Sequence, residues 1–120
     1  MLRNDALIAS FLVARGFRIV DPEGLSFEEQ VRIFSNAEIV VGVMCAALCN
    51  VIFSSPNITL VALAPNGWVE PFYWDLATAL GHRYVAIHGA RENLSPHPHL
   101  DDFSIDFGLF QRAMDEVLAY

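Results

Sequence analysis

Basic residues are scarce in this sequence. Seven lysine and arginine residues stand against fourteen aspartate and glutamate residues, the formal net charge is −7, and the basic residues form no cluster. Proteins that bind nucleic acid neutralise its phosphates with clustered lysine and arginine side chains. The composition therefore argues against nucleic-acid binding, and for the same reason against attachment to an anionic membrane surface.

Long apolar runs are missing as well. No run approaches the roughly 18 residues that a membrane-spanning helix needs. The segment from Met1 to Arg15 is too polar and too interrupted for a signal peptide. We therefore expect no membrane span and a cytoplasmic location.

Cysteine is rare, and its two positions match no redox or metal motif. Cys45 and Cys49 are four residues apart, which places them on one face of a helix but forms neither a CxxC pair nor half of a zinc ribbon. We interpret them as free, buried thiols in a reducing compartment. Phosphate-binding loops, nucleophile elbows and paired-carboxylate motifs are not evident either. We expect no cofactor and no metal.

Apolar residues, by contrast, are abundant. The 120 residues suit one domain, residues 1–120, with a single core. Hydrophobic residues make up 54% of the chain and the mean hydropathy is +0.39. Such a chain buries its strands on both faces or keeps apolar surface for a partner. The sequence therefore predicts a homodimer or higher oligomer.

Helix and strand patterns alternate along the chain. The expected helices begin at Asn4 or Asp5, at Ser26, near Met44, at Pro71 and at Leu109. The expected strands are residues 17–20, 38–41, 58–63 and 83–87, and residues 88–106 form a long loop. Strands separated by helices of this length predict an α/β fold: a three-layer, Rossmann-like parallel sheet of about four strands with helices on both faces.

The junction between the second strand and the third helix is the candidate ligand site. Ligands of open parallel sheets bind beyond the carboxyl ends of the strands, often at a helix N-terminus. Here a strand leads into Gly42 and then into a helix of small residues that includes Ala46 and Ala47. Its backbone N–H groups suit a phosphate. The alternative is a close strand-to-helix turn without a ligand.

Two further clusters have both a functional and a structural interpretation. His97 and His99 flank Pro98 in an extended stretch that resembles a metal-binding loop, but no carboxylate or thiol supports them, which favours a solvated loop. Aromatic residues crowd positions 68–74; they are core or interface anchors, or else one of them stacks on a base or sugar.

From Gly16 onward, the order of residues is similar to that of glycosyltransferase family 61, which includes bacterial capsular-polysaccharide biosynthesis proteins. The similarity is most specific between Ser26 and Pro56. The residues that carry it are 16–23, 25–31, Phe34, Ala37, 39–42, Ala46, Leu48, 50–53 and Pro56, followed by Leu76, Ala77, Leu80, Gly81 and Tyr84. The resemblance implies the nucleotide-sugar lobe of a glycosyltransferase, the C-terminal lobe of a GT-B fold.

The working positions of that lobe are altered. By the resemblance, the nucleotide-sugar site comprises Gly42, Met44, Cys45, Ala46, Asn50 and Ala62. Met44 stands where the family has a histidine and Cys45 where it has a glycine, while Cys49 replaces a threonine or serine. Ala62 stands where the family has a glutamate. Methionine cannot protonate a leaving diphosphate, and alanine cannot accept bonds from a ribose.

These substitutions set the functional expectations. The resemblance implies a glycosyltransferase-like domain of capsular or exopolysaccharide synthesis, degenerate or incomplete, with no confidently assigned catalytic residue. The isolated chain is expected to be inactive and to bind a nucleotide-sugar weakly at most. Its expected partner is a second copy or a missing N-terminal lobe. The alternative is a non-catalytic, oligomerising interaction module.

Overall fold

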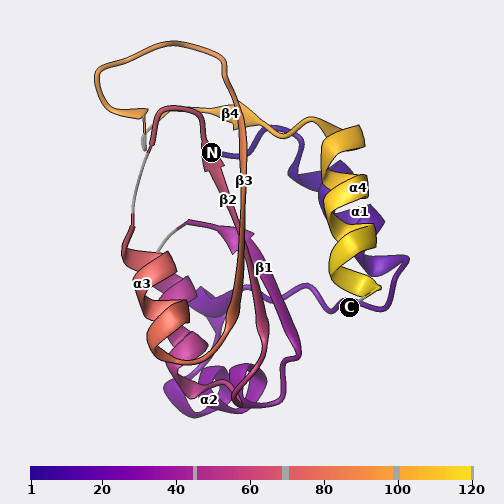
Figure 1. Cartoon of the computed structure of the whole chain (residues 1–120), viewed down its shortest axis with the longest axis vertical. Coiled ribbons are helices and arrows are strands. Elements are labelled where there is room, and N and C mark those ends of the chain that lie inside the picture. Colours follow the sequence, from indigo (N-terminus) through magenta and orange to yellow (C-terminus); the bar gives the residue numbers. More distant parts are fainter. Residues whose placement is uncertain (45, 69–70, 99–100, 120) are drawn as a thin grey trace.

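A computed structural model of the chain describes residues 1–44, 46–68, 71–98 and 101–119 (Figure 1). The alternating helices and strands confirm the predicted α/β class. Two of the helices, η1 and η2, are 3₁₀ helices. The elements in chain order are α1 (Asp5–Val13), η1 (Pro22–Gly24), α2 (Phe27–Ser35), β1 (Ile39–Val43), η2 (Ala46–Phe53), β2 (Thr59–Pro65), α3 (Phe72–Ala79), β3 (Arg83–Arg91), β4 (Phe103–Ser104) and α4 (Phe107–Leu118).

The four strands form one sheet in the order β1-β2-β3-β4. The first three are parallel, with Gly42 opposite Ala62 and Ala62 opposite Ala86. β4 runs antiparallel to β3 and places Ser104 opposite Ala90. The sheet is therefore mixed, which corrects the prediction of a purely parallel sheet.

Helices cover both faces of the sheet, as Figure 1 shows: α1 and α4 lie on one side, and α2, η2 and α3 on the other. β2 contributes to both cores, because successive side chains of a strand point to opposite faces. Val61 and Leu63 pack with α1 and α4, whereas Leu60, Ala62 and Ala64 pack with η2 and α3. All five are buried, which explains why residues 60–64 form an unbroken apolar run.

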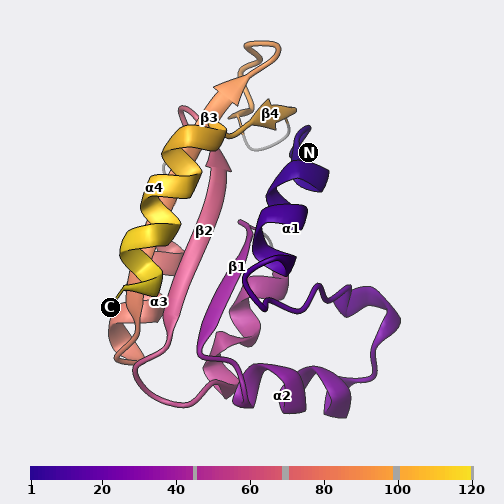
Figure 2. The same cartoon turned by 90° about the vertical axis from the view of Figure 1, so that its right-hand side faces the viewer.

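The predicted strand at residues 17–20 is wrong, since the structure assigns no strand there. The Phe17 N–H donates to Leu12 O (3.0 Å) after the left-handed Gly16 (φ +88°), so Phe17 closes the turn that follows α1 and packs against the core on the α1 side of the sheet. The chain between α1 and α2 then loops out beyond the outer edge of β1 (Figure 2). Residues 17–20 therefore form no strand pair with β1.

The predicted loop at residues 88–106 contains a strand pairing that the sequence analysis missed. β3 continues to Arg91, and β4 pairs with its last residues. The available signal was the alternation of Phe103, Ser104 and Ile105, in which the two apolar residues are buried and Ser104 is partly exposed. A two-residue strand is too short for such alternation to be distinctive in a sequence.

The N-terminal segment joins the segment around β4. Asn4 occupies the N-cap position of α1, but its side chain makes no capping bond. Its Nδ2 donates to Ile105 O (2.8 Å), its Oδ1 accepts from the Ile105 N–H (3.1 Å), and the Arg3 N–H donates to Phe103 O (2.8 Å). We call this pairing of Asn4 with Ile105 the terminal clasp.

Other local signals give mixed results. Ser26 caps α2 as predicted, and the left-handed Gly81 (φ +75°) follows α3. The last helix begins at Phe107, two residues before the predicted start at Leu109, because the Asp106 carboxylate accepts a bond from the Leu109 N–H (3.1 Å). Within the described ranges, no helix is long and apolar enough to cross a membrane.

Candidate functional site

The predicted ligand site lies where β1 leads into η2. The Met44 N–H donates to Leu63 O (2.9 Å), so this amide belongs to the pairing of β1 with β2. η2 begins at Ala46 and is a 3₁₀ helix, whereas the sequence analysis expected a regular helix from Met44. The Met44 amide is therefore committed to the sheet and does not face a bound anion.

Gly42 allows β1 and η2 to pack closely. A Cβ atom at this position would lie 2.9 Å from Leu48 Cδ2, which is closer than real Cβ contacts. Leu48 is buried in the core between η2 and the sheet. This geometry supports the alternative interpretation of the motif, a close strand-to-helix turn.

Met44 is a core residue at the end of β1. Its side chain is only 6% exposed and belongs to the apolar cluster that also contains Leu48 and Val51. A thioether offers neither a proton nor a strong hydrogen bond. Met44 therefore fills space where the family resemblance implies a histidine that contacts substrate.

Ala62 lies in the middle of β2, between Gly42 and Ala86 on the neighbouring strands. It is fully buried against the η2 and α3 side of the sheet. Because β2 continues to Pro65, Ala62 does not mark the carboxyl end of its strand. A carboxylate at this position would be surrounded by apolar side chains.

Asn50 connects η2 to α2. Its Nδ2 donates to Gln30 Oε1 (2.8 Å), and Gln30 Nε2 donates to Pro22 O (2.9 Å) and Leu25 O (3.3 Å). The amide of Asn50 thus anchors α2 and the turn that precedes it. Of the remaining predicted site residues, Cys45 lies outside the described residues, and the side chains of Ala46 and Cys49 do as well.

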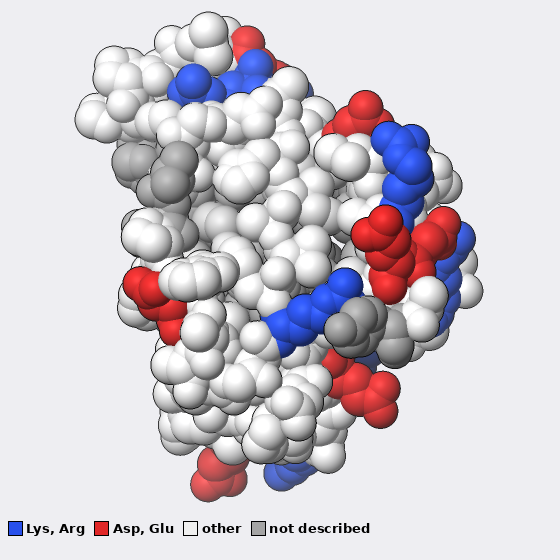
Figure 3. Space-filling model, in the orientation of Figure 1, with Lys and Arg blue, Asp and Glu red and all other residues white. Residues whose placement is uncertain are grey.

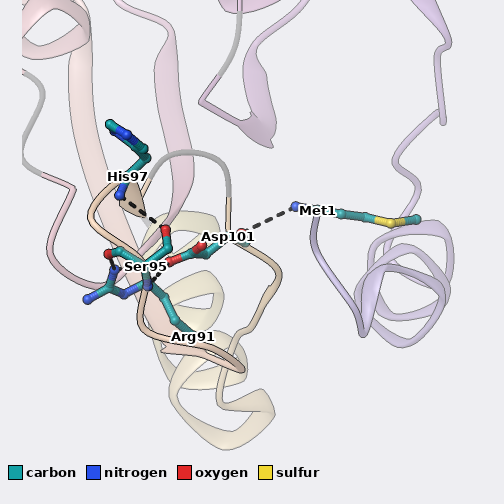
Figure 4. A network of polar contacts seen from close by, with 5 residues as sticks. All are labelled: Met1, Arg91, Ser95, His97 and Asp101. Atoms are coloured by element: carbon teal, nitrogen blue, oxygen red, sulfur yellow. Dashed lines mark hydrogen bonds and ion pairs between the residues drawn. The ribbon is translucent and has the colours of Figure 1, made fainter.

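An ion pair between Arg91 and Asp101 organises the loop that contains His97 (Figure 4). Arg91 Nη1 donates to Asp101 Oδ2 (3.1 Å) and to Ser95 O (3.2 Å), and the Ser95 N–H donates to the same carboxylate oxygen (3.2 Å). The His97 N–H donates to Ser95 Oγ (3.1 Å). Among the described residues, no group of three or more metal-ligating side chains occurs, and His99 lies outside them.

Asp101 has a perturbed acidity within this loop. Hydrogen bonds from Ser95, together with the Arg91 guanidinium, hold the pKa of the Asp101 carboxyl below its ordinary value. The side chains of Arg91 and Asp101 are 14% and 10% exposed, so the pair is more shielded from water than a surface ion pair. No sequence pattern predicted this pair, because its members are ten residues apart and joined by an irregular loop.

A groove of about 800 Å³ runs along the outer edge of β1. We call it the edge groove. Its walls are β1, the end of α2 and the looping segment from Gly16 to Pro22, and Leu12 and Leu118 also contribute. The groove could not be predicted from the sequence, because it exists only where the predicted strand at residues 17–20 fails to form.

The fold defines a class: an α/β domain with a mixed four-stranded sheet and helices on both of its faces. A family model described as glycosyltransferase 61 matches residues 1–61. The chain belongs to this family. The match includes α1, which the residue-by-residue similarity omitted, and it ends one residue before Ala62. No curated protein shows significant similarity to the chain.

Proposed function

We propose that the chain is a glycosyltransferase-like lobe, related to capsular or exopolysaccharide synthesis, whose nucleotide-sugar site has degenerated so that the isolated chain transfers no sugar. The proposal rests on the burial of Met44 and Ala62 in the apolar core between the sheet and the helices η2 and α3. Both positions, which the family resemblance assigns to substrate contacts, serve packing in this chain. An N-terminal lobe on another chain is the proposed partner for any remaining activity.

The energies support at most weak nucleotide binding. A helix N-terminus favours an anion by about 0.3–1 kcal/mol when exposed, whereas micromolar affinity needs about 8 kcal/mol. The difference must come from polar side chains and from closure of a second lobe. Met44 and Ala62 offer no polar groups, and the net charge of −7 opposes a polyanionic ligand.

Calorimetric titration with UDP, GDP and CMP tests the proposal directly. We expect no saturable heat at micromolar ligand, with or without Mg²⁺. Micromolar binding to the unmodified chain would contradict the proposal.

A pair of variants tests whether a former site is present at the end of β1. Met44→His and Met114→His each place an imidazole in a buried position, but on opposite faces of the sheet. Both variants should lose stability, and only Met44→His should gain nucleotide affinity. If the two variants show the same nucleotide affinity, the former site does not lie at the end of β1.

A second candidate function, an oligomerising interaction module, is favoured by exposed aromatic residues. Phe72 and Trp74 on α3 are 48% and 55% exposed. Figure 3 shows that the lower left of this face, over α3, carries few charged side chains. We expect sedimentation at micromolar concentration to show more than one protomer. Trp74→Glu should shift the particle to a monomer, whereas Glu92→Gln, on the β3–β4 loop, should not.

A further inference from the structure

β1 presents an unpaired edge. The Met44 N–H donates to Leu63 O and Glu38 O accepts from the Thr59 N–H, so the even-numbered residues of β1 direct their backbone groups toward β2. Because the backbone direction alternates, Ile39, Val41 and Val43 direct theirs outward. No strand within the described ranges pairs with that edge. It offers three N–H groups and three carbonyls at strand spacing.

The edge groove is basic in an acidic chain. The basic residues of the chain are seven arginines, and three of them, Arg15, Arg18 and Arg32, line the groove, against one acidic residue, Glu38. The ion pairs among the described residues use Arg3, Arg91 and the N-terminal ammonium, and none of them involves the groove arginines. The groove therefore concentrates cationic side chains without partner carboxylates.

Arg15 illustrates how these cations are presented. Its guanidinium lies over the ring of Phe11, 3.5 Å from the ring centroid, and Nη1 donates to Phe11 O (3.3 Å). This stacking holds the charge at the groove wall and leaves other guanidinium N–H groups for a ligand. Nearby, Ile19 is 58% exposed and Leu118 is 42% exposed, so the same wall offers apolar contact.

We propose that the edge groove binds an acidic polypeptide segment as an added β-strand on β1. Backbone groups at strand spacing recognise a peptide backbone, apolar walls accept alternate apolar side chains, and the arginines select acidic ones. Five extended residues span about 17 Å, which corresponds to the length of β1.

The charges argue against a second copy as the occupant. Pairing two β1 edges would bring two arginine-lined walls together, and juxtaposed like charges are unfavourable. The chain's own segment at residues 17–20 is part of the wall. It is held there by the Phe17 bond to Leu12 at one end and by the Gln30 bond to Pro22 at the other.

The test uses fluorescence anisotropy with a labelled seven-residue peptide that alternates valine and glutamate. We expect saturable binding that weakens with salt. A peptide with lysine in place of glutamate should not bind. The acidic peptide N-methylated at every second residue, in the register that blocks the pairing edge, should lose binding. Equal binding of the lysine peptide or of the N-methylated peptide would overturn the proposal.

Charge-reversal variants localise the binding. Arg18→Glu and Arg32→Glu should each weaken the acidic peptide by roughly fivefold or more. Arg112→Glu, on α4 and outside the groove, is the matched control and should change the affinity by less than about twofold. All of these side chains are exposed, so folding is preserved. An equal effect of the Arg112 variant would contradict the assignment.

Amide exchange provides a second readout that separates ligand classes. Saturating acidic peptide should slow exchange at Ile39, Val41 and Val43, while Val40 and Gly42 are already protected by β2. If polygalacturonate, an anionic polysaccharide, binds in an arginine-dependent manner and the peptide does not, the groove is a carbohydrate site and the proposal is wrong. Self-association that protects the same amides without peptide would also overturn it.

Discussion

Gly42 can be tested by adding a single methyl group. Gly42→Ala places a Cβ atom 2.9 Å from Leu48 Cδ2 in a packed core. We expect it to lower the free energy of unfolding by about 1–3 kcal/mol, because the core must shift to admit the methyl group. Denaturant unfolding followed by circular dichroism measures this change.

Gly24 is the matched control for that substitution. A Cβ atom at Gly24 meets nothing within 4 Å, so Gly24→Ala should be neutral or slightly stabilising. Combining Gly42→Ala with Leu48→Ala should cost less than the sum of the two single changes, since each relieves the other. Strict additivity would show that the two side chains do not compete for space.

Asp101 gives a prediction about pH. Its pKa is lowered in the folded protein, so its contribution to stability is fully present above the ordinary carboxyl value of 3.8 and is lost as the pH falls through the lower folded value. Asp101→Asn should therefore be less stable than the wild type at pH 7, and the two should converge in strong acid. Urea unfolding between pH 2 and pH 7 checks this.

Asp102→Asn serves as the control, because Asp102, the next residue in the sequence, forms only surface ion pairs. Asp102 Oδ2 lies 3.7 Å from Arg3 Nη1, and both side chains are more than 40% exposed. The loss of stability at pH 7 should be smaller than for Asp101→Asn. If both variants behave alike, the shielding of the Arg91–Asp101 pair has no energetic consequence.

At the scale of elements, α2 depends on its cap. Ser26 Oγ accepts a bond from the Glu29 N–H (3.1 Å) and donates to Glu29 Oε1 (3.1 Å). Ser26→Ala should lower the free energy of unfolding by about 1 kcal/mol. Ser35→Ala, which removes a hydroxyl that donates to Arg32 O inside the same helix, should be close to neutral. Similar losses in both variants would argue against a specific capping effect.

Elements with local signals were predictable from the sequence, and elements that depend on distant partners were not. Ser26 and Glu29 mark the start of α2 whatever surrounds it. Residues 17–20 have strand-like composition, but they form one wall of the edge groove and do not pair with β1. β4 forms because Phe103 meets Arg91, a contact that no local pattern encodes.

The candidate site shows the same division. The sequence predicted a strand before Gly42 and a helix after it, but Gly42 lies within β1, and the following helix, η2, begins only at Ala46. Three features of the site follow from packing between segments and could not be predicted from the sequence. Leu48 requires the glycine at position 42, Asn50 bonds to Gln30, and Ala62 lies inside β2. The arginines of the edge groove lie far apart in sequence, on α2 and on the segment that follows α1, so their proximity could not be read from spacing.

At the scale of the whole molecule, the two cores differ in how they are assembled along the chain. The core on the η2 side consists of residues between Phe34 and Tyr84. The core on the α1 side combines residues from Leu2 to Phe17 with residues from Phe103 to Val117, together with the strands between them. One core is thus built from a continuous segment, and the other requires both ends of the chain.

The terminal clasp therefore has a kinetic consequence. Asn4 and Ile105 are 101 positions apart in the sequence, so joining them closes a long loop and costs chain entropy before any contact is gained. We therefore expect the terminal clasp to form after the main folding barrier. Asn4→Ala should leave the folding rate unchanged and raise the unfolding rate about five- to thirtyfold for a loss of 1–2 kcal/mol. Val51→Ala, in the continuous core, should instead slow folding in stopped-flow measurements. If Asn4→Ala slows folding, the contact between the chain ends already forms in the transition state. Refolding molecules would then have to make that contact before they cross the main barrier, contrary to the prediction.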